Sequence, residues 1–315
     1  MGITEVGREA RERLAVRFGP EAREWCDRLP ALVGELAGRW GLEVLEAGGG
    51  GTSRVFRCVR RGDGAVVWMK LTPNPLIATQ EAEALRAWAG VPAVVGLVAE
   101  DPEVGALLLE GVEPGTPLRE LPGGLWRPER VAGLLGALRG HAPAGGPGSV
   151  LPTLAERVEF LFVLAGRRLD GRCPDAAGRC GAEEPSLRRL LERGRKEAAT
   201  LAGSGPAGLV HGDLHPGNVL DGGSGRGFVA VDPRPCLGDP DFDAADWVLE
   251  GVSDTAEAVR RAGELAALVP GSSSGRILGW CRALAPLVAV PRAAAGRDDP
   301  ATRFLLEWCG GSTGG

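Results

Sequence analysis

Apolar residues change their spacing along the chain, and the change predicts three segments. Residues 1–40 show helical spacing, with Pro30 in the first turn of one helix, and we expect them to pack as a helical extension on the next segment. Residues 41–112 carry short apolar runs that predict five antiparallel strands, interrupted by one helix over residues 78–88. Residues 113–315 return mainly to helical spacing. The pattern therefore predicts an α+β fold in which a small sheet precedes a larger helical part.

The most informative stretch lies between predicted helices, at residues 209–220, where apolar residues flank a polar centre. It holds Asp213 and, five positions later, Asn218. Phosphotransferases need such a pair, because the Asp orients an acceptor hydroxyl and takes its proton while the Asn oxygen holds a magnesium ion on the nucleotide phosphates. Pro216-Gly217 suits a tight turn that would direct both side chains to one point.

A second carboxylate follows a short buried strand. Residues 228–231 are apolar and lead directly into Asp232. The link over residues 221–227 is rich in turn residues, so a hairpin would return Asp232 to the mouth of the polar loop. Because Mg²⁺ prefers oxygen ligands, Asn218 and Asp232 together predict the metal ligands.

These residues carry a family resemblance. His211-Gly212-Asp213-Leu214-His215-Pro216-Gly217-Asn218, Val231-Asp232-Pro233-Arg234-Pro235 and Gly238-Asp239-Pro240-Asp241-Phe242-Asp243 resemble the motifs of the aminoglycoside and hydroxyurea phosphotransferases. Asp-Pro in place of the Asp-Phe-Gly of protein kinases points to the streptomycin 6-kinase-like branch. The resemblance implies a bilobal protein-kinase-like fold, with residues 41–112 as the nucleotide-binding lobe and hinge, and residues 113–315 as the helical lobe with the acceptor pocket.

The resemblance also implies supporting roles around the loop. His211 would hold the loop by packing and backbone hydrogen bonds, and His215 would position it or contact phosphate. Asp239 is predicted as a helix N-cap, with Pro240 at the first helical position. Asp243 would brace the loop through backbone N–H groups.

The sheet segment supplies the predicted nucleotide contacts. Glycines at residues 48–51 let a backbone approach phosphates closely, and Thr52 and Ser53 add hydroxyl groups for the β-phosphate. Lys70 ends the third predicted strand, where a lysine reaches the α- and β-phosphates. Only one other lysine, Lys196, occurs in the chain.

A carboxylate on the following helix is expected to hold Lys70. Both Glu81 and Glu83 are candidates, and Glu81 is favoured because it shares a helix face with Leu85. Either glutamate alternatively provides a favourable charge near the helix N-terminus. By resemblance, backbone groups from Glu110 to Val112 form the hinge that contacts the adenine ring.

Composition limits the other possibilities. Apolar residues make up 44% and charged residues 24% of the chain, as in globular proteins, and the net charge of −5 argues against a nucleic-acid partner. No apolar run is expected to reach the length of a membrane span, about 20 residues, so we expect a cytoplasmic protein without a membrane partner. The 7 cysteines, Cys173 and Cys180 included, lack zinc-site spacing and are expected to be free thiols.

The expected function is transfer of the γ-phosphoryl group of ATP or GTP, with Mg²⁺, to a hydroxyl of an antibiotic or related natural product. The expected partners are thus a nucleoside triphosphate and a small-molecule acceptor. A metabolic kinase of a sugar or amino alcohol and a non-catalytic nucleotide-binding protein are the alternatives. Acidic and basic residues are balanced in the C-terminal helices, which leaves room for a weakly basic acceptor such as hydroxyurea. His-Gly-Asp in place of His-Arg-Asp argues against a protein kinase.

Overall fold

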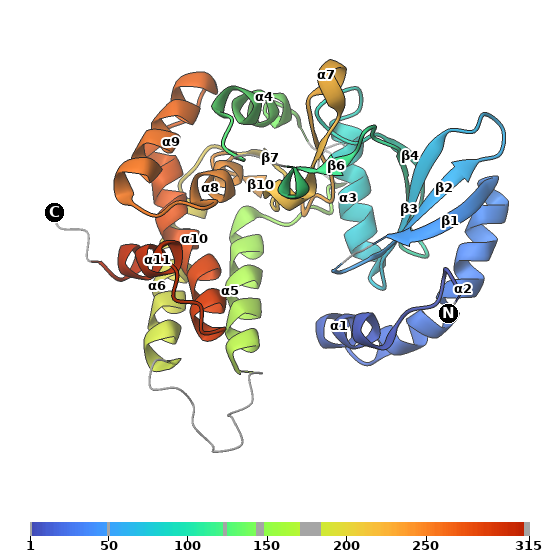
Figure 1. The fold of residues 1–315 in the computed structure, drawn as a ribbon, viewed down its shortest axis with the longest axis horizontal. Helices are drawn as coiled ribbons and strands as arrows, with labels where there is room; N and C mark the ends of the chain where they lie inside the picture. Colours follow the sequence, from blue (N-terminus) through green and yellow to red (C-terminus); the bar gives the residue numbers. More distant parts are fainter. Residues whose placement is uncertain (1, 49–50, 122–124, 143–147, 171–183, 312–315) are drawn as a thin grey trace. The chain divides into compact units, whose positions relative to one another are not determined.

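The chain folds into two compact units (Figure 1). The structure is a computed structural model and describes residues 2–48, 51–121, 125–142, 148–170 and 184–311. Unit 1 contains residues up to 116 together with 148–150 and 221–234, and unit 2 contains the other described residues. Unit 1 thus includes the first two predicted segments, residues 1–40 and 41–112.

Unit 1 is built on a five-stranded antiparallel sheet with strand order β1-β2-β3-β5-β4. The predicted α+β class and its five antiparallel strands are confirmed. The third strand ends next to Lys70, so the sheet fixes the backbone of that residue on both sides by pairing with β2 and β5. The strands are β1 (Leu42–Gly48), β2 (Arg54–Arg60), β3 (Val66–Leu71), β4 (Leu97–Asp101) and β5 (Ala106–Glu110).

Of the two N-terminal helices, α2 (Glu21–Arg39) packs on this sheet and α1 (Arg8–Phe18) packs on α2. Leu29 and Leu36 of α2 are fully buried and share a core with residues of β2 and β3. Pro30 lies in the middle of α2, so its predicted place in a first turn is wrong. A proline inside a helix removes one backbone hydrogen bond, and burial of the apolar face of α2 offsets that loss.

Helix α3 (Pro75–Ala87) begins three residues earlier than predicted. The side chain of Asn74 accepts a hydrogen bond from the N–H of Leu76 at 3.1 Å and so caps the helix, and Pro75 occupies its first turn. These two residues explain the earlier start. The face that carries Glu81 is buried.

Residues 221–234 join unit 1 because they hydrogen-bond to its sheet region. The N–H of Val95 donates to the carbonyl oxygen of Ala230 at 3.0 Å. The guanidinium of Arg226 donates to the carboxylate of Glu110 at 2.5 Å. The predicted turn-rich link contains one helical turn. This helical turn is α7 (Gly223–Arg226), and the link runs from strand β8 (Val219–Asp221) to strand β9 (Phe228–Ala230).

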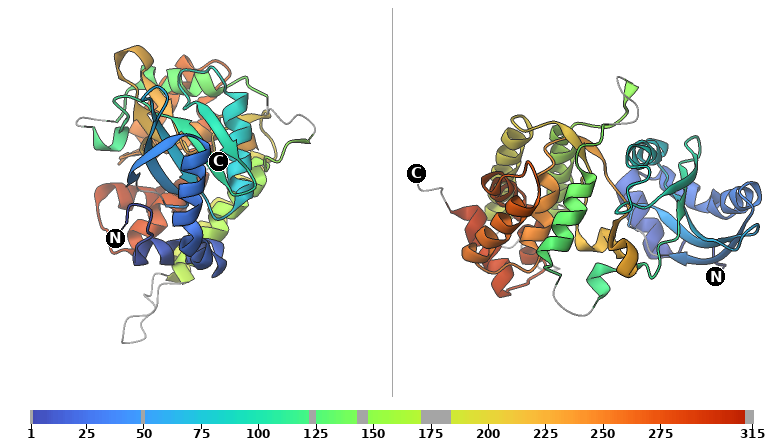
Figure 2. Two further views of the ribbon diagram at one scale, coloured as in Figure 1. Left: turned by 90° about the vertical axis from the view of Figure 1, so that its right-hand side faces the viewer. Right: turned by 90° about the horizontal axis from the view of Figure 1, so that it is seen from above.

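Unit 2 is organised around α10, which packs against α5, α6, α8, α9 and α11 (Figures 1 and 2). Strands β7 and β10 pair antiparallel. Residues 208–210, just before the polar loop, therefore lie beside residues 236–238. The remaining elements are β6 (Thr116–Pro117), η1 (Leu118–Glu120), α4 (Pro128–Leu138), α5 (Leu154–Asp170), α6 (Glu184–Ala202), β7 (Gly208–Val210), η3 (Pro216–Asn218), β10 (Cys236–Gly238), α8 (Phe242–Leu249), α9 (Thr255–Leu268), α10 (Ser274–Ala294) and α11 (Pro300–Gly310).

Helix α10 corrects one expectation from the sequence. Among the described residues it is the one helix that is long and apolar enough to span a membrane. Half of its most apolar stretch is buried inside the fold, and Trp280 and Ala285 are fully buried. A central core helix meets the same length and composition criteria, and α10 has five packed neighbours in unit 2.

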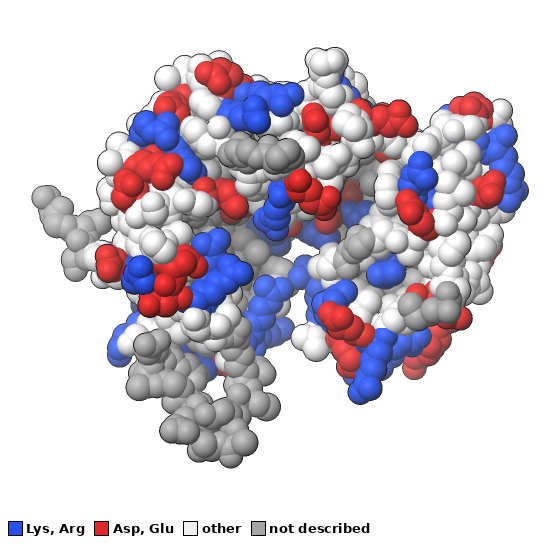
Figure 3. All heavy atoms as spheres, viewed as in Figure 1, with Lys and Arg blue, Asp and Glu red and all other residues white. Residues whose placement is uncertain are grey.

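The described cysteines are buried free thiols. Burial raises the pKa of Cys58 to about 11 and that of Cys309 to about 11, so both remain protonated near neutral pH. Cys173 and Cys180 lie outside the described residues. The surface drawn in Figure 3 carries acidic and basic side chains interspersed with one another. Arg260 and Glu264, one helical turn apart, form one ion pair of this kind at 2.6 Å.

Candidate active site

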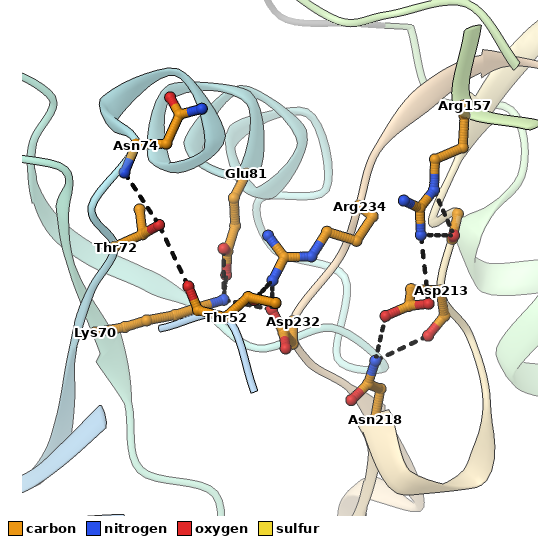
Figure 4. A network of polar contacts seen from close by, with 11 residues as sticks. Thr52, Lys70, Thr72, Asn74, Glu81, Arg157, Asp213, Asn218, Asp232 and Arg234 are labelled. Carbon is orange, nitrogen blue, oxygen red and sulfur yellow. Dashed lines mark hydrogen bonds and ion pairs between the residues drawn. The ribbon is translucent and has the colours of Figure 1, made fainter. Parts of the chain in front are cut away.

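Lys70 of β3 forms a buried ion pair with Glu81 of α3 (Figure 4). Lys70 and Glu81 are 5% and 1% exposed, and Lys70 Nζ lies 2.7 and 2.5 Å from the two carboxylate oxygens of Glu81. Glu83, the other candidate, accepts a hydrogen bond from the N–H of Val150 at 3.1 Å. The ammonium of Lys70 also lies 2.6 Å from Asp232 Oδ1. Lys70 of β3 therefore contacts two carboxylates of unit 1, one on α3 and one just after β9.

This cluster balances two carboxylates with two cations. The guanidinium of Arg234 lies 3.3 Å from Asp232 Oδ1. Burial raises the pKa of Glu81, the charge of Lys70 lowers it, the charge of Asp232 raises it and that of Arg234 lowers it. Buried carboxylates are stable only when such cations compensate them. The cluster is therefore a set of mutually dependent charges.

Asp232 has an unusual backbone. Its φ angle is +56°, in the left-handed region that non-glycine residues rarely occupy. Asp and Asn tolerate this region better than other residues, but the conformation still costs about 1 kcal/mol. Such backbone strain persists where a side chain must be aimed, and here it directs the carboxylate at Lys70.

The glycine-rich loop of unit 1 is attached to this cluster through Thr52. The Thr52 hydroxyl accepts a hydrogen bond from the Arg234 guanidinium, and its carbonyl oxygen accepts one from the Thr72 hydroxyl at 3.4 Å. Ser53 is buried. Gly49 and Gly50 lie outside the described residues. The loop thus ends at a side chain that contacts the ion cluster.

The predicted hinge begins at the end of β5. The N–H groups of Glu110 and Gly111 donate to the carbonyl oxygens of Gly96 and Val66 at 3.0 and 2.9 Å. The Glu110 carboxylate accepts hydrogen bonds from Gly96 and from the Arg226 guanidinium. Val112 is buried. The side chain of Glu110 therefore holds the start of the predicted hinge in place.

In unit 2, the polar loop holds Asp213 against Asn218 (Figure 4). The amide Nδ2 of Asn218 donates to the backbone oxygen of Asp213 at 2.9 Å and to its Oδ2 at 3.1 Å. This leaves the amide oxygen of Asn218 directed away from Asp213 (Figure 4). Gly212 has φ +76°, which explains why a glycine stands between His211 and Asp213.

Arg157 of α5 is a site residue that sequence reasoning missed. It is 9% exposed, and its Nε and Nη2 donate to the carbonyl oxygen of Gly212 at 3.2 and 3.0 Å. Its Nη2 also lies 3.4 Å from Asp213 Oδ1. The available signal was an arginine close to the buried stripe of Leu154 and Val158 in an apolar helix. Arg157 supplies the positive charge beside Asp213.

Asp243 of α8 supports the same loop from another direction. Its carboxylate accepts hydrogen bonds from the N–H groups of His211 at 2.8 Å and Gly212 at 2.9 Å. Burial raises the pKa of Asp243 to about 7, although these two hydrogen bonds and the charge of Arg139 lower it. The imidazole of His211 is fully buried. The backbone of the loop is thereby fixed on both sides of Gly212.

His215 and Asp239 have separate structural roles. His215 Nδ1 accepts a hydrogen bond from the N–H of Gly217 at 3.0 Å and caps η3. The predicted N-cap role of Asp239 is wrong, because α8 begins at Phe242 with Asp241 at the N-cap.

Asp239 instead makes a local turn and binds α10. Its carboxylate accepts hydrogen bonds from the N–H of Asp241 at 3.0 Å, from Trp280 Nε1 at 2.5 Å and from the guanidinium of Arg276. A turn closed by an Asp side chain two residues back competes with helix capping, which moves the start of α8 forward. These contacts attach the segment to α10, with Asp239 and Trp280 buried and Arg276 partly exposed.

Asp246, one turn after Asp243 on α8, was also missed from the sequence. It is partly buried, and burial raises its pKa to about 7. The carboxylates of Asp213, Asp243 and Glu250 raise that pKa further, whereas Arg157 lowers it. Unit 2 therefore concentrates negative charge around Asp213, and Arg157 is the cation that opposes it.

The comparisons with known proteins agree with one another. A family model described as aminoglycoside/hydroxyurea antibiotic resistance kinase matches residues 39–296. The chain is 36% identical over 256 residues to a hydroxyurea phosphotransferase of Kitasatospora aureofaciens, covering 79% of this chain and 69% of that protein. It is 31% identical over 285 residues to a streptomycin 6-kinase of Streptomyces glaucescens, covering 88% and 87% of the two chains.

A solved structure shares the fold at lower sequence similarity. The choline kinase of Streptococcus pneumoniae matches with a TM-score of 0.59 and 16% identity, covering 90% of this chain and 99% of that one. At this level of identity the likeness concerns the fold alone.

Proposed function

This chain belongs to the aminoglycoside/hydroxyurea antibiotic resistance kinase family, and we propose that it transfers the γ-phosphoryl group of a nucleoside triphosphate to a hydroxyl group of an antibiotic or related natural product. The observation that carries the proposal is the hydrogen bonding between Asp213 and Asn218 in a loop fixed by Asp243. It supplies a carboxylate for the acceptor hydroxyl and an amide oxygen for a metal ion within one short segment.

Asp213 is the base in this proposal. Its carboxylate orients the acceptor hydroxyl toward the γ-phosphorus and takes its proton as the new oxygen–phosphorus bond forms. The bond from the γ-phosphorus to the β-phosphate oxygen breaks in the same step, and the nucleoside diphosphate leaves. Arg157 holds the peptide before Asp213 and places a positive charge 3.4 Å from Oδ1. That arrangement restricts the rotation of the Asp213 side chain, so the hydroxyl is met by a carboxylate in a defined position.

Lys70 holds the phosphates in unit 1. Its position is set by Glu81, whose two oxygens accept hydrogen bonds from Nζ in a buried environment. Charge neutralisation by Lys70 is stronger there than at the surface, because the surroundings exclude water. Thr52 and Ser53 belong to the loop that we expect to cover the phosphates.

The donor set fits Mg²⁺. Asn218 contributes an amide oxygen that is not turned toward Asp213, and Asp232 contributes a carboxylate on a strained backbone. Both are hard oxygen ligands, and Mg²⁺ characteristically takes one or two protein oxygens together with substrate phosphates. When bound, the ion would neutralise charge on the phosphates. The Asp232 carboxylate also lies close to the cationic groups of Lys70 and Arg234.

The proposed setting is the cytoplasm, where nucleoside triphosphates are available, and the proposed biological outcome is resistance or self-protection against an antibiotic. Hydroxyurea and streptomycin are the acceptors named for the two relatives described above. Both offer hydroxyl groups, and they differ greatly in size and charge. The experiment therefore has to identify which acceptor molecule this chain phosphorylates.

The test is mass spectrometry of the purified protein incubated with Mg²⁺, either ATP or GTP, and a panel of acceptors. The panel contains streptomycin, hydroxyurea, a macrolide, a nucleoside antibiotic and choline. We expect one antibiotic to gain a phosphoryl group with the wild-type protein and not with Asp213→Ala. Phosphorylation of choline alone would replace the antibiotic kinase by a metabolic one, and nucleotide hydrolysis without any acceptor product would reject the proposal.

A further inference from the structure

Arg234 belongs to the ion cluster around Lys70, and one nitrogen of its guanidinium is buried without a hydrogen-bond partner among the described residues. Its side chain is 11% exposed. Nη2 donates to the Thr52 hydroxyl and lies 3.3 Å from Asp232 Oδ1. Nη1 is buried and has no hydrogen-bond partner among the described residues. A buried N–H group without an acceptor is unfavourable, so a site for an acceptor is expected beside it.

The backbone holds Arg234 in this place. It stands between Pro233 and Pro235, whose rings fix φ on both sides, and it follows the strained Asp232. Pro233 is buried. The guanidinium therefore has less freedom than an ordinary loop arginine and is pre-positioned beside Lys70 and Asp232, as Figure 4 shows.

The charges around Arg234 indicate what kind of ligand it would take. Lys70 and Arg234 just balance Glu81 and Asp232 in the structure. A nucleoside triphosphate adds several negative charges, and Asp232 would be one of the residues that hold its Mg²⁺ ion. With Asp232 binding the ion, the guanidinium of Arg234 would have an anion of the nucleotide as its partner, and its planar fork matches phosphate oxygens.

We propose that Arg234 is a second phosphate-binding cation of the nucleotide site, which donates through Nη1 to the terminal phosphates while Lys70 serves the phosphates nearer the nucleoside. The Thr52–Arg234 hydrogen bond holds the guanidinium in the absence of nucleotide. This inference rests on the proposed kinase function. It gives Arg234, the arginine of the Asp-Pro-Arg-Pro sequence, a role in binding phosphate in addition to its contacts within the fold.

The experiment compares nucleotide affinities, because these need no acceptor. Titration calorimetry with Mg²⁺ measures ATP, GTP and AMP binding to the wild type, R234Q and R234K. The control is R60Q, which removes an exposed arginine of the same unit that pairs with Asp63. Circular dichroism and thermal melting establish that each variant is folded. If R234Q does not fold, R234K supplies the comparison, because it keeps the charge and loses the fork.

We expect R234Q to weaken triphosphate binding by about 10- to 100-fold and to leave AMP binding nearly unchanged. R234K should fall between R234Q and the wild type, and R60Q should match the wild type. Equal triphosphate affinity in R234Q or R234K and the wild type, or an equal loss for ATP and AMP, would overturn the inference while the kinase function stands. A wild-type protein that binds neither triphosphate would overturn the kinase function as well.

Discussion

Lys70 Nζ contacts Asp232 Oδ1 at 2.6 Å while it is also held by both carboxylate oxygens of Glu81. One ammonium therefore connects the sheet, α3 and the residue that we expect to hold the metal ion. A compact charge with rotatable donors suits a position between two carboxylates, whereas a planar guanidinium has a fixed fork of donors. The identity of the cation matters at this position.

Lys70→Arg is expected to reduce turnover by about 100-fold or more despite the conserved charge. The larger guanidinium would have to displace Glu81 or Asp232 in a site where both lysine and glutamate are buried. Steady-state phosphorylation of the acceptor found by mass spectrometry gives the measurement.

The matched control is Lys196→Arg. Lys196 lies on α6 with 73% of its side chain exposed and pairs with Glu192 at 3.5 Å, so an arginine is accommodated there. The control should retain wild-type activity. If Lys70→Arg is as active as this control, Lys70 does not act through the geometry described here.

Asp213→Ala should lower turnover by about 1,000-fold or more and leave nucleotide affinity within about 3-fold of the wild type. The carboxylate acts on the acceptor hydroxyl, and its structural partners are Asn218 of the loop and Arg157 of α5. Turnover from mass spectrometry and affinity from calorimetry separate the two effects. A variant that keeps its turnover would remove Asp213 from the chemistry, and one that loses nucleotide binding would indicate disruption of the loop.

The sequence predicts the parts of the site that depend on short spacing. Asp213 and Asn218 are five residues apart, and the glycine between His211 and Asp213 is required by the local backbone. The pairing of Lys70 with a glutamate of the next helix is implied by the family resemblance, and the helix face shared with Leu85 favours Glu81. The structure pairs Lys70 with Glu81. Short-range geometry leaves a readable trace because few conformations satisfy it.

The parts that the sequence does not predict depend on long-range packing. Arg157 lies 55 residues before Gly212, and many other arginines occur in the chain. The start of α8 was misplaced because the side chain of Asp239 closes a local turn instead of capping the helix. Asp239 either closes the turn or caps the helix. Arg276 and Trp280 of α10 donate hydrogen bonds to its carboxylate and so favour the turn. Neither partner is visible in the local sequence.

Arg157→Lys tests the positioning of the base. Lysine keeps the charge but cannot donate with two nitrogens to the Gly212 carbonyl while reaching Asp213. We expect kcat to fall by about 10-fold with an unchanged nucleotide KM, because the contacts of Arg157 are with the loop.

The control for this substitution is Arg195→Lys, which alters an arginine of α6 that pairs with Glu159 and Glu192 at the surface. It should leave both kinetic constants unchanged. A fall in thermal stability for Arg157→Lys without a change in kcat would show that Arg157 supports only the fold.

Asp246 predicts a pH dependence of stability. Its pKa is raised from 3.8 to about 7, chiefly by burial and then by the charges of Asp213 and Asp243. A raised pKa means that the folded protein holds a proton that the unfolded chain has already released. Stability from this group is therefore complete below the unfolded pKa and falls as the pH rises through the interval up to about 7.

Asp246→Asn removes the ionisation, so the variant should gain stability relative to the wild type as the pH rises. We expect a gain of about 1–2 kcal/mol at pH ~8 compared with pH ~4.5, measured by urea unfolding at both values. Asp298→Asn, at a position with 81% of its side chain exposed, controls for the substitution itself. A stability difference between Asp246→Asn and the wild type that is the same at both pH values would mean that Asp246 ionises equally well in the folded and unfolded chain. The negative charge assigned to the surroundings of Asp213 would then be overstated, because the carboxylates of Asp213 and Asp243 are the first charges to act on Asp246 after burial.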